Sequence, residues 1–170
     1  CLSRFHLDET KRTSELSEGM KVKYQLALAM SHGAKLLILD EPTSGLDPVS
    51  RDDLLDLFLT LCEDDGVSIL FSTHITTDLE ACASNITYIK NGRIFASASK
   101  DDFLHRYVLV SGTPEQLTPA LRAALLGARC RRDAFDGLLP AEKAPLAAGC
   151  TCTQPSLEQL MVHLEKEAEK

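Results

Sequence analysis

The chain has 170 residues, of which 44% are hydrophobic, and a formal net charge of −7. This hydrophobic content is enough for a folded core and excludes an intrinsically disordered chain. The acidic balance argues against nucleic acid as a partner. No apolar run approaches the roughly 18 to 20 residues that cross a bilayer, and no signal peptide is recognisable. We therefore expect a location in the cytosol or on the cytosolic face of a membrane.

The first hundred residues alternate between predicted helices and strands. A helix is predicted from Ser17, which suits an N-cap, to Gly33. The continuous apolar runs at 36–39 and 67–71 predict strands that are buried on both faces. The helix between these strands has one apolar face, made of Leu54, Leu55, Phe58, Leu61 and Cys62. Three further elements are predicted: a helix over 75–82, a hairpin of 86–89 and 93–98 around Asn91-Gly92, and a helix over 100–106.

The composition changes near Tyr107, and the remaining residues predict a small α+β segment. Residues 107–110 read as a strand, and 114–126 as a helix with an apolar face. Residues 127–153 carry no clear pattern. A final helix opens at Pro155, with apolar residues at helical spacing: Leu157, Leu160, Met161 and Leu164. We therefore expect two parts, residues 1–106 and residues 107–170.

Two adjacent carboxylates, Asp40 and Glu41, follow the strand at 36–39. Ligands of open α/β sheets bind at the carboxyl ends of the strands. One carboxylate there can hold Mg²⁺ through water, and its neighbour can orient an attacking water, as in nucleotide triphosphatases. The strand at 67–71 leads into Ser72-Thr73-His74, so we expect the fold to bring His74 beside Glu41.

Three motifs resemble those of ATP-binding cassette (ABC) ATPases. The run Leu16-Ser17-Glu18-Gly19-Met20 resembles the family's Leu-Ser-Gly-Gly-Gln signature, and residues 36–47 resemble its Walker B strand and D-loop. His74 looks like the family's switch histidine. The resemblance covers residues 1 to about 100. It implies an α/β, partial P-loop NTPase fold: a mainly parallel sheet flanked by helices, with a small C-terminal α+β extension.

The resemblance also implies roles for individual residues. Asp40 would hold Mg²⁺, Glu41 would be the catalytic carboxylate, and His74 would contact the γ-phosphate. Residues of a second subunit would complete the site, because the family binds ATP between two subunits arranged head to tail. The residues that match these cross-interface positions are Ser17 and Gly19 of the signature and Asp47 of the D-loop.

Several positions depart from the family pattern. Glu18 replaces a glycine and brings a negative charge near the phosphates, which should weaken rather than abolish binding if it points to solvent. Met20 replaces a glutamine and removes an amide donor. No Gly-x-x-x-x-Gly-Lys-[Ser/Thr] phosphate loop (Walker A) occurs, and the chain begins at Cys1. We therefore expect the C-terminal part of a longer cassette, inactive by itself.

The resemblance implies the ATP-binding subunit of a bacterial, export-type ABC transporter that uses ATP and Mg²⁺. Its expected partners are a second ABC ATPase subunit, identical or different, and integral membrane permease subunits, with no nucleic acid. Its expected location is cytoplasmic, peripheral on the inner face of the cell membrane. Two alternatives stay open: a soluble ABC ATPase of DNA repair or translation, and a non-catalytic folded module.

Three further expectations concern exposure. Four histidines match no partner motif and are expected at the surface: His6, His32, His105 and His163. Asp78 and Glu80, in the predicted helix at 75–82, are expected to be solvated. In the family, the strand that feeds the phosphate loop lies beside the strand at 67–71. Without it, we expect this edge to promote self-association, with Val67, Ile69 and Phe71 losing cover on one side.

Overall fold

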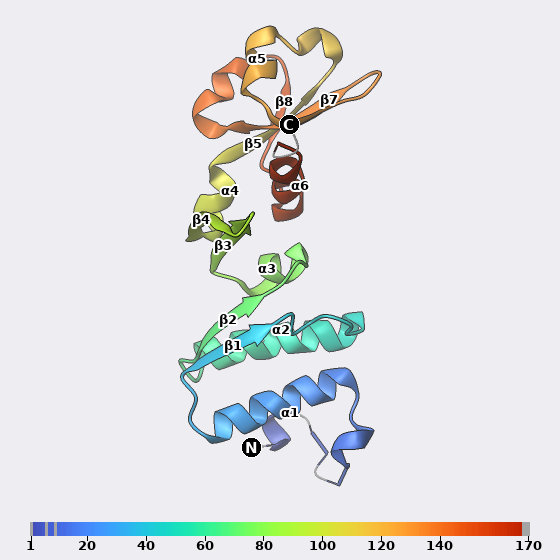
Figure 1. The fold of residues 1–170 in the computed structure, drawn as a ribbon, viewed down its shortest axis with the longest axis vertical. Helices are drawn as coiled ribbons and strands as arrows, with labels where there is room; N and C mark the ends of the chain where they lie inside the picture. The colour runs from blue at the N-terminus through green and yellow to red at the C-terminus, as the bar shows by residue number, and fades with distance from the viewer. Residues whose placement is uncertain (1, 6, 9, 168–170) are drawn as a thin grey trace. The chain divides into compact units, whose positions relative to one another are not determined.

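The computed structural model describes residues 2–5, 7–8 and 10–167, so Cys1 and His6 lie outside the described residues. The chain divides into two compact units, residues 1–82 and 83–170 (Figure 1). None of the helices in the described ranges combines the length and the apolar composition that crossing a bilayer requires.

The first unit alternates helices and strands, as the sequence predicts. It consists of η1 (Leu2–Phe5), η2 (Thr13–Glu15), α1 (Glu18–Ser31), β1 (Leu36–Asp40), α2 (Pro48–Glu63), β2 (Ser68–Ser72) and α3 (Thr76–Cys82). Ser17 caps α1, because its Oγ accepts a hydrogen bond of 3.3 Å from the Met20 N–H. The core of the unit joins α1, α2, β1 and the N-terminal residues Phe5 and Leu7, which are both buried.

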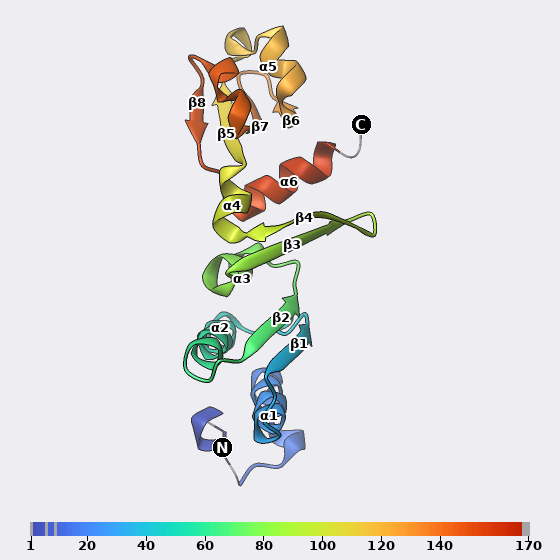
Figure 2. The same ribbon diagram turned by 90° about the vertical axis from the view of Figure 1, so that its left-hand side faces the viewer.

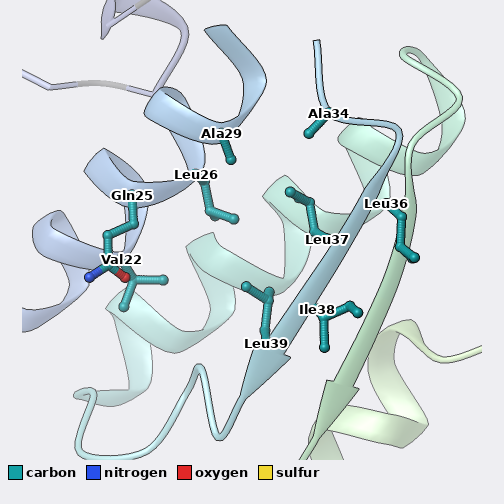
Figure 3. Close-up of a pocket in the computed structure, with 9 residues that line it drawn as sticks. All are labelled: Val22, Gln25, Leu26, Ala29, Ala34, Leu36, Leu37, Ile38 and Leu39. Carbon is teal, nitrogen blue, oxygen red and sulfur yellow. The ribbon is translucent and has the colours of Figure 1, made fainter. Parts of the chain in front are cut away.

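Strands β1 and β2 pair in parallel, with Asp40 opposite Ser72. The prediction that these strands are buried on both faces is wrong. Leu37 is buried against the helices, whereas Leu36, Ile38 and Leu70 are 55%, 71% and 60% exposed. Figure 3 shows Leu37 and Leu39 directed toward α1, with Leu36 and Ile38 directed away. Alternate residues of a strand point to opposite faces, and α1 and α2 both pack on the same face.

Two smaller predictions in this unit also need correction. The residues expected to lose cover belong to the covered side: Val67 lies in the core, Ile69 packs against it, and the ring of Phe71 lies 5.8 Å from that of the buried Phe58. On α2, Leu54, Leu55, Phe58 and Leu61 are buried as predicted, but Cys62 is exposed. Cys62 follows Phe58 by four residues and so shares its side of α2, but it lies in the last turn of the helix.

The second unit is mostly antiparallel. Its elements are β3 (Asn85–Lys90), β4 (Arg93–Ser99), α4 (Lys100–His105), β5 (Tyr107–Gly112), η3 (Pro114–Gln116), α5 (Pro119–Ala124), β6 (Leu126–Cys130), β7 (Phe135–Pro140), η4 (Ala141–Ala147), β8 (Thr151–Thr153) and α6 (Leu157–Glu167). Strands β3 and β4 form the predicted hairpin, with Asn91 at φ 50° and Gly92 at φ 71°. The other four strands form a sheet in the order β6-β7-β5-β8. Figure 2 shows α5 and α6 on opposite sides of this sheet.

Helix α6 connects the hairpin to the C-terminal sheet. The Tyr88 hydroxyl donates to the Glu165 carboxylate, and the Lys90 ammonium donates to the Leu164 carbonyl. Contacts of this kind place residues 83–106 in the same compact unit as the C-terminal segment, although the sequence divides the chain near 106. The end of the family-like part at residue 106 stays a prediction.

The predicted helix at 114–126 is broken into η3 and α5. Pro119 has no N–H to continue a helix, and Thr118 adopts extended angles of φ −64° and ψ 154° and caps α5. Residues 127–153, which gave no pattern, contain most of β6 and all of β7, η4 and β8. His32 and His105 are exposed as predicted, but His163 is buried, with its Nδ1 2.9 Å from the Gly127 carbonyl oxygen.

Candidate functional site

The carboxyl ends of β1 and β2 bring polar groups together because the two strands are parallel and in register. Asp40 lies opposite Ser72, and the Ser72 hydroxyl donates a hydrogen bond to Asp40 Oδ1. The Glu41 N–H continues the ladder by donating to the Ser72 carbonyl at 3.0 Å. Register and backbone pairing therefore fix the direction in which the two carboxylates leave the strand.

Glu41 and His74 meet just beyond the strand ends, as predicted. Their closest atoms, Glu41 Oε1 and His74 Nδ1, are 3.0 Å apart. The side chain of Glu41 is 35% exposed and that of His74 is 76% exposed. The second carboxylate oxygen of Glu41, Oε2, is buried and has no hydrogen-bond partner among the described residues. An ionised carboxylate only accepts hydrogen bonds, so this contact places a proton on His74 Nδ1.

The signature-like residues lie at the start of α1, against the start of α2. Gly19 is buried, and a Cβ added to it would lie 3.2 Å from Ser50 Cβ and 3.8 Å from Leu46 Cδ2. A larger side chain at residue 19 would therefore push α1 away from the loop that follows β1. Ser17 Oγ is engaged as the helix cap, and the first N–H groups of α1 are those that a helix leaves without an internal partner.

Glu18 and Met20 are the two departures from the signature. Glu18 points to solvent, with 70% of its side chain exposed, and it pairs with Lys21 at 2.7 Å. Because a neighbouring ammonium offsets its charge, Glu18 leaves little unbalanced negative potential at the helix start. The Met20 N–H donates to the cap, Ser17.

Asp47 caps α2. Its Oδ1 accepts hydrogen bonds of 3.1 Å from the N–H groups of both Val49 and Ser50. Hydrogen bonding from Ser50, by the side chain first and then the backbone, lowers the pKa of the Asp47 carboxyl. Within this chain, Asp47 therefore holds the start of a helix, and among the described residues no hydrogen bond or ion pair joins it to Glu41.

A buried polar cluster beside the site was missed by the sequence analysis. The Thr43 hydroxyl donates to Asp78 Oδ2 at 2.5 Å, and Thr43 and Asp78 are 0% and 1% exposed. Arg51 Nε lies 3.9 Å from the other oxygen of Asp78. The expectation that Asp78 is solvated is therefore wrong, because α3 turns this residue toward the loop after β1. A single acidic residue in a short helix gives no sequence signal for such burial.

Comparisons with known proteins agree with these motifs. The family model described as "AAA domain, putative AbiEii toxin, Type IV TA system" matches residues 8–77. ABC transporter I family member 21 of Arabidopsis thaliana is 40% identical over 91 residues, which are 54% of this chain and 32% of that protein. The ABC transporter ATP-binding protein YtrB of Bacillus subtilis is 30% identical over 109 residues, which are 64% of this chain and 37% of that protein.

Over its first part the chain is similar to ABC ATPases. Among solved structures, cbiO1 from Clostridium perfringens, part of the ABC transporter complex cbiONQ, has a TM-score of 0.53 and 30% identity over 60% of this chain and 42% of that one. The fold class expected from the sequence is confirmed. Parallel pairing within the described residues is confined to β1 and β2. The chain spans about a third of the length of the curated relatives it matches.

The carboxylates at the C-terminal end of β1 suit the magnesium ion that the resemblance to ABC ATPases implies. Mg²⁺ prefers oxygen ligands, and typically takes one or two carboxylates together with water and substrate phosphates. Asp40 offers an exposed carboxylate oriented by the Ser72 hydroxyl, and Glu41 has a carboxylate oxygen without a partner in the described residues. The described residues hold no cluster of three or more His, Cys, Asp or Glu side chains that could bind a metal by themselves. A site completed by phosphate oxygens and water fits this donor set.

A separate apolar pocket lies between α1 and β1. Its volume is about 210 Å³, and its lining is shown in Figure 3: Val22, Gln25, Leu26, Ala29, Ala34, Leu36, Leu37, Ile38 and Leu39. None of the candidate site residues lines it. With a single polar lining side chain, Gln25, this pocket is unsuited to a triphosphate.

Proposed function

We propose that this chain is the signature-to-switch part of an ABC ATPase subunit that hydrolyses Mg-ATP. The observation that carries the proposal is the state of the Glu41 carboxylate. One oxygen lies 3.0 Å from His74 Nδ1, and the other is buried without a partner, next to Asp40 at the ends of two parallel strands. A part-exposed carboxylate that is oriented by a histidine and lies beside a second carboxylate is suited to hold an attacking water.

In the proposed reaction, the Glu41 carboxylate accepts a hydrogen bond from water and orients it toward the γ-phosphate. His74 keeps Glu41 in place through Nδ1–H. If His74 Nε2 also donates to a γ-phosphate oxygen, the ring carries protons on both nitrogens and its positive charge offsets charge that develops on the phosphate. Asp40 would hold Mg²⁺, which neutralises phosphate charge when bound.

The remaining site residues would act across a subunit interface. The first turn of α1 presents backbone N–H groups beside Ser17 and Gly19, and a helix N-terminus favours an anion. We propose that this turn contacts the γ-phosphate of ATP held by a second ABC ATPase subunit. Asp47 would lie at the same interface in addition to capping α2.

We further propose that the subunit is cytoplasmic, lies on the inner face of a membrane, and drives integral membrane permease subunits. Export is the direction that the resemblance to export-type ABC subunits favours. The relatives include a thiamine import ATP-binding protein of Mesorhizobium japonicum, 36% identical over 95 residues, so a transport assay has to decide the direction. Relatives from Arabidopsis, Bacillus and Dictyostelium do not narrow the source to bacteria.

A non-catalytic module is the second candidate, and one observation favours it. Ser17 and Asp47, two of the proposed cross-interface side chains, are both engaged as helix caps within this chain. In that case the surface around α1 and α2 would serve to hold a partner, with no reaction at Glu41.

The test is ATP turnover by the complete protein with Glu41→Gln. The amide keeps the shape but is a poor base, so phosphate release should fall at least about 10²-fold. Glu63→Gln is the matched control, because Glu63 is an exposed residue at the end of α2 and should leave turnover unchanged. Equal turnover of wild type and Glu41→Gln would assign the base elsewhere. Because the 170-residue chain has no phosphate-loop motif, it should release no phosphate by itself.

A further inference from the structure

Three polar links join the end of β1 and the loop after it to the end of β2 and the segment after it. The first two involve Asp40 and Glu41 and lie at the exposed end of the strands. The third is the hydrogen bond of 2.5 Å from the Thr43 hydroxyl to Asp78, and both of these residues are buried. Thr43 follows Glu41 by two residues, and Asp78 follows His74 by four, so the buried link fixes the same two segments that carry the Glu41–His74 contact.

The buried carboxylate of Asp78 holds this link in one arrangement. An acidic side chain that is 1% exposed is costly unless hydrogen bonds or opposite charges compensate it. Thr43 supplies the hydrogen bond, and Arg51 of α2 supplies a positive charge at 3.9 Å. At this distance the pair is not hydrogen-bonded, and neither Asp78 Oδ1 nor Arg51 Nε has a hydrogen-bond partner among the described residues. Asp78 therefore ties the loop after β1, helix α2 and helix α3 to one point.

The loop after β1 needs such an anchor because Glu41 has an unfavourable backbone conformation. Its φ is 46°, in the left-handed region that non-glycine residues rarely adopt. Conformations of this kind persist only when the surrounding structure enforces them. Two turn hydrogen bonds link the loop to its anchor: Ser44 N–H to the Glu41 carbonyl at 3.1 Å, and Leu46 N–H to the Thr43 carbonyl at 3.2 Å.

We propose that Thr43 and Asp78 are positioning residues, which hold the Glu41 carboxylate in the orientation that meets His74. The catalytic consequence rests on the function proposed above, whereas the positioning itself does not. Two substitutions of Thr43 separate the role of its hydroxyl group from that of its shape. Thr43→Val keeps the shape and removes the hydroxyl, and Thr43→Ser keeps the hydroxyl and removes a methyl group.

The first measurement reads positioning without activity, in the complete protein with isotope-labelled histidine. Glu41→Gln should shift the NMR signals of the His74 ring in the wild-type background and in Thr43→Ser. The same change should cause little shift in Thr43→Val or Asp78→Asn, because the contact is already loosened. Asp56→Asn, an exposed acid on α2, should behave as wild type. If Glu41→Gln shifts the His74 ring signals equally in Thr43→Val and in Thr43→Ser, the proposal is overturned.

The second measurement uses hydrogen exchange and turnover in the same variants. Exchange of the Ser44 and Leu46 amides should be about tenfold faster in Thr43→Val than in Thr43→Ser. Turnover should fall in Thr43→Val. The factor by which Glu41→Gln lowers turnover should be smaller in Thr43→Val than in wild type, and a change in stability alone would not produce this coupling. If Glu41→Gln lowers turnover by the same factor in wild type and in Thr43→Val, Thr43 does not position Glu41. If the wild-type protein shows no turnover, the proposed function is wrong. The NMR comparison then tests the positioning role by itself.

Discussion

The Nδ1 atom of His74 lies 3.0 Å from Oε1 of Glu41, although 33 positions separate the two residues in the chain. The parallel register of β1 and β2 produces this contact, because Asp40 pairs with Ser72 and both segments leave the sheet at the same edge. The geometry gives His74 two separable functions: Nδ1 orients Glu41, and Nε2 is the ring nitrogen that can face a phosphate.

We expect His74→Ala to slow ATP turnover by the complete protein about 10²-fold, in the range for removing one donor to developing charge. ATP affinity should change less, because the other phosphate contacts remain. The measurements are steady-state phosphate release and equilibrium nucleotide binding. His32→Ala, at an exposed histidine just beyond α1, is the control. A large loss of ATP affinity with unchanged turnover at saturation would contradict a role in the reaction step.

The exposed face of β1 and β2 predicts self-association of the 170-residue chain. Leu36, Ile38 and Leu70 present a contiguous apolar surface, and such surfaces associate to leave water. Size-exclusion chromatography with light scattering should show mass increasing with concentration. Ile38→Lys should reduce the increase, whereas Leu28→Lys, at an exposed leucine of α1, should not. A compact wild-type monomer with a sharp, reversible melt would contradict this prediction.

Gly127 is required where β6 passes α6. Its φ is 56°, and a Cβ at this position would overlap the backbone carbonyl of His163. Gly127→Ala should therefore lower the free energy of unfolding by about 3 kcal/mol or more, combining backbone strain with overpacking. Gly149→Ala is the matched control, because Gly149 has φ 87° but open space around the added carbon, and it should cost about 1 kcal/mol. Urea unfolding measures both, and equal losses would contradict the steric account.

Asp47 allows the helix cap to be separated from an interface role. Asp47→Ala removes the acceptor of two N–H groups and should lower the Tm by about 5 °C, whereas Asp47→Asn keeps a good cap. If Asp47→Asn keeps the Tm but slows turnover, the charge acts at the subunit interface. If both variants keep wild-type turnover, Asp47 is a cap only.

The same residue predicts a pH dependence of stability. The folded-state pKa of Asp47 is lowered by hydrogen bonding from Ser50. A lowered folded-state pKa means that the ionised cap stabilises the fold above the unfolded-state pKa of about 3.9, and that this contribution is lost as the pH falls through the folded-state pKa. The difference in Tm between wild type and Asp47→Ala should therefore shrink below about pH 4. Melting curves from neutral to acidic pH measure it.

Local sequence patterns determined most elements of the first unit, the hairpin of the second unit and the resemblance to ABC ATPases. Ser17 predicts the start of α1, the apolar runs predict β1 and β2, and Asn91-Gly92 predicts the hairpin, because these signals depend on residues close together in the chain. The same patterns placed Asp40, Glu41 and His74 at strand ends, and parallel pairing then made the Glu41–His74 contact foreseeable.

Only the tertiary structure decided burial and the polar partners of buried groups. The apolar run at Leu36–Leu39 does not reveal which face is covered, since that depends on where α1 and α2 pack. Asp78 and His163 look like surface residues in sequence, but both are buried. Thr43 and Arg51 lie against Asp78. Gly127 and Asp136 lie against His163. Those partners come from distant parts of the chain, and the free energy that compensates a buried polar group is set by such contacts and not by local propensity.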